Sequence, residues 1–327
     1  SGACRPANST SLAGEPVRVR SSSGGASGSR AVRLFWNDAD LRDPFIRTIA
    51  DTVLTHLERA ESPGTGDAVL YPHDVRDSRV SLPDIVEHAE RARRSGRRLL
   101  VFQLSDSTVP IASPNTLVFR TSMLRSKRLP HEHVLPYVWD AVPDRMRSCE
   151  SWQRPCWTRG EAPPIVGFCG CPNTHPLRKR VLDTLQDRLP CRFLLRDRFW
   201  AGAPHDPTVV REFFENILAT DLTLAVRGAG NFSHRLYQTL SCGRVPLLVG
   251  HDAVMPYEGV ESIDWDDVAV RVEAHRLDGI ESAIERFRER ARDHRDLSQR
   301  ILDVHRRYFT PEAFAHHLAR HRDRYLA

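Results

Sequence analysis

Apolar and polar positions alternate in a regular rhythm between residues 31 and 120. Short apolar runs that predict strands lie at 31–36, 68–71, 98–104 and 116–120. Two segments between these runs carry helical spacing, 44–60 and 82–94. In the first of them, Phe45, Ile49 and Val53 recur every four residues and therefore share one helical face. Strands that alternate with helices in this way predict a parallel sheet covered on both faces.

The same rhythm restarts after residue 163. Predicted strands lie at 164–169, 191–195, 221–226, 245–249 and 268–272. Predicted helices lie at 176–189, 208–218 and 233–240, and residues 278–327 are helical and highly charged. The chain therefore contains a second α/β sheet of similar size, followed by C-terminal helices.

The break between the two rhythms predicts the domain organisation. Residues 31–150 form an N-terminal Rossmann-like domain, and residues 164–327 form a C-terminal one that includes the terminal helices. Residues 151–163, rich in proline, cysteine and mixed charge, are the predicted linker, and the Ser-, Gly-, Ala- and Arg-rich residues 1–30 are a predicted disordered tail. Two such sheets predict an enzyme with its site between them, beyond the carboxyl ends of the strands.

One segment of the second domain carries most of the candidate chemistry. Its candidate ligand-binding residues are Arg227, Gly228, Gly230, Asn231, Ser233, Arg235 and Gln238. The glycines let the backbone approach a ligand, and a guanidinium matches phosphate oxygens in pairs. A diphosphate is therefore the expected ligand. Each feature alone also fits a plain turn or a solvated arginine.

The same segment resembles the exostosin family of glycosyltransferases. The resemblance rests on the runs Leu224-Ala-Val-Arg-Gly, Ser233-His-Arg-Leu-Tyr-Gln, Gly243-Arg-Val-Pro-Leu-Leu-Val, Met255-Pro-Tyr and Ile263-Asp-Trp. Weaker agreement appears at Thr116-Leu-Val-Phe-Arg and at Ile165-Val-Gly-Phe-Cys-Gly with Arg178. The similarity extends roughly over residues 100 to 310 and is strongest over 221–272.

The resemblance implies a GT-B fold, with two Rossmann-like domains that face each other across a cleft, and an inverting glycosyltransferase. The expected donor is a nucleotide diphosphate sugar, with UDP as the expected nucleotide and a hexosyl or uronosyl group transferred to a glycan or another hydroxyl acceptor. Arg227 and Arg235 would hold the diphosphate, and Arg178 would join the donor site. Gln238 stands where the family has Glu, and an amide accepts hydrogen bonds from ribose hydroxyls less strongly than a carboxylate.

An inverting transfer also needs a base that accepts the proton of the acceptor hydroxyl. The candidates are Asp38 and Asp40, which follow the first predicted strand, and Asp106, which follows the third. No metal and no cofactor are expected, because arginines can stabilise the leaving diphosphate. The Asp-x-Asp spellings at 38–40 and 264–266 leave a metal-dependent transferase open as an alternative, which EDTA sensitivity would reveal.

Charge and composition narrow the remaining choices. The formal net charge is +5, of which the first 30 residues carry +3, so the folded part has too little positive charge to predict nucleic-acid binding. The seven cysteines form no zinc-like spacing. His317 and His321 share a helical face, but without a His-Glu-x-x-His motif they are interpreted, like His316, as solvated.

Two further alternatives stay open. Gln238 also fits a non-catalytic, exostosin-like partner that stabilises an active glycosyltransferase, as part of a homo- or heterodimer. No run of about 18 apolar residues occurs, but the chain begins at Ser1, which leaves room for a preceding membrane anchor. The resemblance implies a Golgi-lumen enzyme in a eukaryote and a cytoplasmic or membrane-peripheral one in a bacterium.

Overall fold

The computed structural model describes residues 31–37, 41, 43–148, 152, 163–203, 206–291 and 296–326. The predicted tail and most of the predicted linker lie outside these ranges. From Ala31 onward the chain forms one compact unit.

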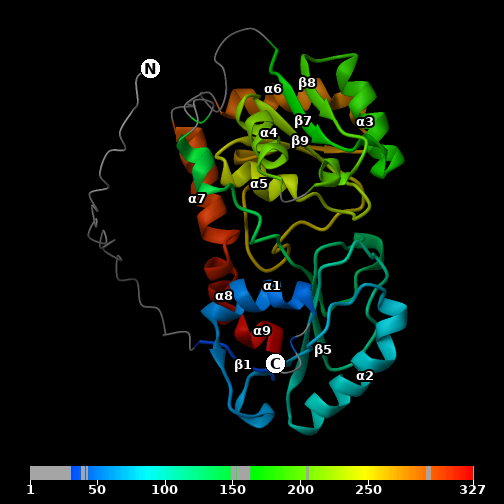
Figure 1. The fold of residues 1–327 in the computed structure, drawn as a ribbon, viewed down its shortest axis with the longest axis vertical. Coiled ribbons are helices and arrows are strands. Elements are labelled where there is room, and N and C mark those ends of the chain that lie inside the picture. The colour runs from blue at the N-terminus through cyan, green and yellow to red at the C-terminus, as the bar shows by residue number, and fades with distance from the viewer. Residues whose placement is uncertain are drawn as a thin grey trace, which may run out of the picture. The chain divides into compact units, whose positions relative to one another are not determined.

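A parallel sheet of six strands organises the first half of the described chain (Figure 1). Its strands are β1 (Arg33–Phe35), β2 (Glu58–Arg59), β3 (Ala68–Leu70), β4 (Arg98–Gln103), β5 (Thr116–Arg120) and β6 (Glu132–Val134). The spatial order is β2-β1-β3-β4-β5-β6, and every neighbouring pair is parallel. The strand order reverses between β1 and β3, which is the point where parallel sheets of this kind bind ligands.

Successive residues of β4 face opposite sides of this sheet, as a strand requires. Leu100 and Phe102 belong to the same apolar cluster as Ile49 of α1 (Pro44–Thr52) and Phe314 of α8 (Pro311–Arg320). Leu99 and Val101 pack instead with α2 (Ser78–Arg94). The sheet is therefore covered by helices on both faces.

A second parallel sheet organises the remaining part of the chain. Its strands are β7 (Val166–Gly170), β8 (Cys191–Leu195), β9 (Leu222–Val226), β10 (Val245–Gly250) and β11 (Val270–Glu273). They stand in the order β11-β10-β9-β7-β8, again with parallel neighbours throughout. Here the order reverses between β7 and β9. The predicted α/β class, with two parallel sheets, is confirmed.

Helices connect and flank the strands of the second sheet. They are α3 (Pro176–Gln186), α4 (Pro207–Leu218), α5 (Arg235–Ser241), α6 (Ile280–Arg290) and α7 (Leu297–Tyr308). Helix α4 begins where Asp206 caps it, because the Asp206 carboxylate accepts the backbone N–H groups of Thr208 and Val209. None of the described helices has the length and the apolar character needed to cross a bilayer.

The last two helices, α8 and α9 (Arg322–Leu326), pack against the first sheet, although they follow the second sheet in sequence. Phe119 of β5 contacts the rings of Phe314 and Tyr325. Arg98 of β4 donates a hydrogen bond to the carbonyl of Tyr325 at 2.7 Å, and Arg322 pairs with Asp67 at 2.6 Å. The C-terminus thus joins the two halves of the molecule, a contact between distant segments that periodicity cannot predict.

Two predicted helices differ from the observed ones, and one observed strand was not predicted. The helix predicted over 44–60 ends at Thr52, and the chain then forms the edge strand β2, whose Glu58 N–H donates to the carbonyl of Val32. Helix α2 begins at Ser78, capped by Asp77, and it tolerates Pro83 in its second turn. Strand β6 was not predicted, since its three residues are mostly polar.

A second set of contacts between the halves joins the loop after β5 to loops of the second sheet. The Asn231 backbone N–H donates to Ser122 Oγ at 2.8 Å, and its side-chain amide donates to the carbonyls of Met123 and Asp252. Arg125 pairs with Glu258 through both carboxylate oxygens, at 2.5 and 2.7 Å. We call these contacts, between residues 122–126 and Asn231, Asp252 and Glu258, the inter-sheet clamp.

Candidate active site

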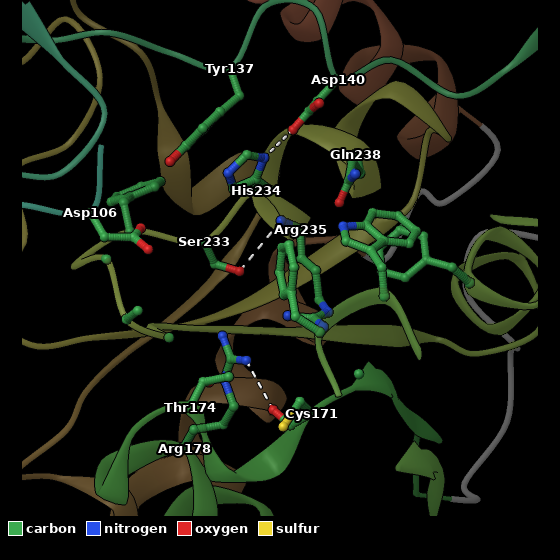
Figure 2. A pocket seen from close by; sticks show the side chains of 18 of the residues that line it. Asp106, Tyr137, Asp140, Cys171, Thr174, Arg178, Ser233, His234, Arg235 and Gln238 are labelled. Atoms are coloured by element: carbon green, nitrogen blue, oxygen red, sulfur yellow. Dashed lines mark hydrogen bonds and ion pairs between the residues drawn. The ribbon is translucent and has the colours of Figure 1, made fainter. Parts of the chain in front are cut away.

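A cavity of about 790 Å³ lies where the carboxyl ends of both sheets meet. From the first half it is lined by residues that follow β3, β4 and β6, and from the second half by residues that follow β7 and β9 and by α5. Figure 2 shows Asp106 and Tyr137 on one side of Ser233 and Arg235, with Arg178 and Cys171 below them. The cavity thus lies at the strand ends, where the sequence placed the site.

Arg178 of α3 is held by three backbone carbonyls. Its guanidinium donates to the carbonyls of Cys171, Val226 and Arg227, each at 3.1 Å, so it bridges the chain ends of β7 and β9. The side chain is 6% exposed and lines the cavity. Three of its five N–H groups are used, which leaves two for a ligand.

Arg235, at the start of α5, also reaches the carboxyl end of β7. Its Nη2 donates to the carbonyl of Cys169 at 2.6 Å, and its guanidinium lies 4.3 Å from the ring centroid of Phe168. Its Nε is buried without a hydrogen-bond partner among the described residues.

The two guanidinium groups form an uncompensated pair. Both lie over Phe168, and neither forms an ion pair with a carboxylate of the described residues. Burial lowers the pKa of Arg178 to about 10, and burial together with the charge of Arg178 lowers the pKa of Arg235 to about 9. Because buried charges without partners are costly, the site favours an anion that would neutralise both.

Glycines make room for these functional side chains. A Cβ atom on Gly228 would lie 2.7 Å from Arg178 Nη2, and one on Gly170 would lie 2.2 Å from Arg235 Nη2. Gly230 has the same relation to Asp106, whose Oδ1 would lie 2.4 Å from the added atom. The predicted need for glycine at 228 and 230 thus comes, in this structure, from the protein's own side chains.

A histidine–aspartate pair also lines the cavity, and its histidine directly precedes Arg235. Nδ1 of His234, which precedes α5, contacts a carboxylate oxygen of Asp140 from the first half. The Tyr137 ring lies against the imidazole, with the two centroids 3.4 Å apart. Both His234 and Asp140 line the cavity. An imidazole oriented by a carboxylate at one nitrogen can accept a proton at the other.

The predicted site residues separate into three groups. Those that line the cavity are Asp106, Arg178, Gly228, Gly230, Ser233, Arg235 and Gln238. Arg227 and Asn231 are not among the lining residues: Arg227 approaches its own loop, and Asn231 belongs to the inter-sheet clamp. Asn231 also does not cap α5, whereas Ser233 Oγ accepts the N–H of Arg235 at 3.4 Å. Asp38 and Asp40 lie outside the described residues.

Several lining residues were not predicted. They are Asp74, Tyr137, Asp140, Gly170, Phe199, Trp200 and His234. His234 lies within the Ser233-His-Arg run that resembles the exostosin family, so the sequence could have indicated it as a candidate. Asp140 lies in the predicted N-terminal domain but was not a candidate, because β6, the strand that precedes it, was not predicted. Trp200 and Ala201 adopt left-handed backbone, with φ of 49° and 51°, and such strain concentrates at functional sites.

The second Asp-x-Asp spelling has a structural role. Asp264 accepts the N–H of Asp266, and Asp266 pairs with Arg271 at 2.7 Å. Trp265 between them is buried beside Phe309. Trp265 is therefore a packing residue, and these two carboxylates do not line the cavity.

Comparisons with known proteins add little to this geometry. No family model matches the sequence. No curated protein matches it either. Among solved structures, the fold is similar to the crystal structure of Anabaena Alr3699/HepE in complex with UDP-glucose, at 11% identity and a TM-score of 0.43, over 90% of this chain and 100% of that one. These values are too low to transfer a ligand or an activity, so the exostosin resemblance stays a prediction.

Proposed function

We propose that this protein transfers a sugar from a nucleotide diphosphate sugar to a hydroxyl acceptor, with inversion at the anomeric carbon. One observation carries the proposal: Arg178 is buried and Arg235 is half-buried beside one aromatic ring, neither pairs with a carboxylate among the described residues, and both line the cavity. A diphosphate presents two adjacent anionic groups, which suits two guanidinium groups held close together.

Leaving-group stabilisation follows from the fixed position of these arginines. Negative charge builds on the diphosphate as its bond to the sugar breaks through an oxocarbenium-like state. Arg178 is held by three carbonyls and Arg235 by one carbonyl and a ring face, so neither has to reorganise when that charge appears. Groups arranged in this way stabilise the transition state more than the bound substrate.

Proton acceptance is assigned to the histidine–aspartate pair. His234, with Asp140 as its positioning residue, accepts the proton of the attacking hydroxyl through the nitrogen that Asp140 does not bind. Of the carboxylates predicted as bases, Asp106 also lines the cavity and is the alternative acceptor.

The finer identity of the reaction comes from the exostosin resemblance alone. It favours UDP as the nucleotide, a hexosyl or uronosyl group as the transferred sugar, a glycan as the acceptor, and no divalent metal. In this proposal Gln238, which is 5% exposed and lines the cavity, contacts the nucleoside in place of the family's Glu.

Binding of UDP, GDP and TDP, measured by calorimetry, tests the proposal. We expect one of them to bind the wild type, and Arg235→Gln and Arg178→Gln each to weaken that binding roughly 10- to 100-fold, since hydrogen bonds to charged groups contribute about 1.5–3 kcal/mol. Arg180→Gln is the matched control, because Arg180 is an exposed residue of the same helix as Arg178. Equal affinity in all four proteins would contradict the proposal.

A non-catalytic partner protein is the second candidate, and the Gln238 amide is the observation that favours it. The two candidates differ in one measurement, the release of nucleotide diphosphate from a sugar donor that the protein binds. Bound donor without turnover, in the presence of a broad panel of acceptors, would favour the partner protein. Turnover that EDTA abolishes would instead favour a metal-dependent transferase.

A further inference from the structure

A cluster of metal-ligand atoms lies outside the cavity, where α8 meets the loop that follows β10. It consists of Glu261, His317 and His321, whose donor atoms all lie within 4.8 Å of one another. Glu261 Oε1 is 3.1 Å from His317 Nδ1 and 3.1 Å from His321 Nε2. The two histidines are four residues apart on α8 and so share one helical face.

The surroundings fix the His317 ring. His317 is 4% exposed, its Nε2 lies 2.7 Å from the hydroxyl of Tyr325, and the ring of Tyr257 lies 4.2 Å from the imidazole. Metal-bound histidines in proteins are usually oriented in this way, by a hydrogen bond at the nitrogen that does not bind the metal. The interpretation of His317 as solvated is therefore wrong, because α8 faces the protein interior here.

Glu261 supplies the negative charge of the cluster. Three groups lie close to the same carboxylate oxygen of Glu261, Oε1. They are the two imidazoles and Arg320, whose Nη1 lies 3.3 Å from that oxygen. The Arg320 side chain is 58% exposed and can move into solvent, whereas Glu261 is 12% exposed and remains in place. The two imidazoles and the carboxylate would then face one another without a competing cation.

We propose that Glu261, His317 and His321 bind one Zn²⁺ ion, with water as the fourth ligand. Two imidazole nitrogens and one carboxylate oxygen form a donor set that zinc uses in proteins. Ligand atoms at the corners of a tetrahedron around zinc stand about 3.3 Å apart. The two carboxylate–imidazole separations of 3.1 Å match this spacing, and the two imidazole nitrogens, which lie within 4.8 Å of each other, would draw together when zinc binds.

The position of this site indicates a structural role. Glu261 lies in the part of the chain that carries the second sheet, whereas α8 and α9 pack against the first sheet. A zinc ion here would join the two halves at a point separate from the inter-sheet clamp. The proposal is independent of sugar transfer, because none of the three ligands lines the cavity.

Zinc titration of the metal-free full chain tests the site. We expect one Zn²⁺ per chain to bind with at least micromolar affinity and to raise the Tm, because a ligand that binds only the folded state stabilises it. His321→Ala and Glu261→Gln should each weaken zinc binding at least about 100-fold, the upper range seen when a metal site loses a supporting group. His316→Ala, an exposed histidine on the same helix, is the matched control.

Two results would overturn the zinc site. One is a wild-type protein that binds no stoichiometric zinc and whose Tm zinc does not change. The other is zinc binding that survives in both His321→Ala and Glu261→Gln. In either case the cluster is a hydrogen-bond network only. Glu261→Gln keeps the shape of the side chain, and the far-UV circular dichroism spectrum of each variant reports whether it is folded.

Discussion

The two halves of the molecule bring different chemistry to the same cavity. From the first half, the ionisable lining residues are Asp74, Arg76, Asp106 and Asp140, together with Tyr137. From the second half they are Arg178, Arg196, Arg235 and His234, with two cysteines and without any carboxylate. Both sets stand at the carboxyl ends of parallel strands, so the topology of the two sheets is alike while their charge is not.

This difference separates binding from proton transfer. On the second half, Arg196 is paired with Glu212, but Arg178 and Arg235 have no such partner among the described residues, which leaves them for an anionic ligand. On the first half, Asp140 reaches across to His234 and Asp106 lies against Gly230. A substrate bound by one half would therefore meet its proton acceptor at the contact with the other half.

The largest expected effect comes from breaking the contact at His234. His234→Gln should lower kcat roughly 10²- to 10⁴-fold, the usual range for a lost general base, while nucleotide diphosphate affinity changes little. Asp140→Asn should lower kcat and change its pH profile, since the imidazole loses its orienting carboxylate. His88→Gln is the control, because His88 also pairs with an aspartate, Asp84, away from the cavity.

Steady-state kinetics and calorimetry on the same preparations separate the two roles. If His234→Gln loses nucleotide affinity and keeps kcat, His234 binds the nucleotide. The proposed role of His234 as the proton acceptor is then wrong. If Asp106→Asn alone loses kcat, then Asp106 is the base.

Acid should lower the free energy of unfolding, because the second half contains a buried histidine. His305 of α7 is 7% exposed, and burial lowers its pKa from 6.5 to about 4. The unfolded chain therefore binds a proton at a higher pH than the folded one, and stability falls as the pH drops from about 6.5 towards 4. The expected loss from this residue is about 3 kcal/mol over that range.

Urea unfolding at pH 7, 6, 5 and 4 measures this loss. His305→Leu should show a shallower decline below pH 6.5 than the wild type. His133 of β6, whose pKa burial lowers to about 3, makes the corresponding contribution in the first half. An equally steep decline in His305→Leu would show that other groups cause the acid sensitivity.

Gly170 offers a way to disturb the binding side alone. Gly170→Ala would place a methyl group against Arg235 Nη2 at a residue whose φ is +152°, so the guanidinium has to move. We expect nucleotide diphosphate affinity to fall about tenfold, the lower end of what a hydrogen bond to a charged group contributes. Gly279→Ala is the control in the same half, since a Cβ there meets no atom within 4 Å. Calorimetry that gives equal affinities for both variants would contradict the role of Arg235.

The smallest effect is expected at Gln238. Gln238→Glu restores the carboxylate of the exostosin pattern, and charge-assisted hydrogen bonds to hydroxyls are about twice as strong as neutral ones. We expect a gain in UDP affinity of roughly threefold to tenfold, measured against the binding of UDP to the wild type. Weaker binding would show that Gln238 does not face the ribose.

The sequence pattern around each predicted strand indicated some of the residues that line the cavity. Asp106 directly follows a strong apolar run and Arg235 lies on the helix after another, so the sequence could place both at the carboxyl edge of a sheet, whereas Arg178 was expected only from the exostosin resemblance. The sequence also predicted that Gly228 and Gly230 allow a close approach. The identity of the approaching groups, Arg178 and Asp106, depends on tertiary contacts that the sequence does not encode locally.

Non-local contacts account for the residues that were missed. His234 and Asp140 are 94 residues apart, and Asp140 follows β6, a strand of three mostly polar residues that periodicity does not detect. Arg227 carries the right charge at the right strand end, but it does not line the cavity. Side-chain direction, unlike position along the chain, depends on packing against neighbours that only the folded structure supplies.

The inter-sheet clamp has a consequence for engineering. Asn231 follows directly after a cavity-lining glycine, and its three hydrogen bonds reach both Ser122–Met123 and Asp252. A chimera that takes one half from another protein to change its specificity would break these bonds unless residues 122–126 are transplanted to match Asn231, Asp252 and Glu258. The second half should therefore be grafted together with residues 122–126, the loop of the first half that contacts it.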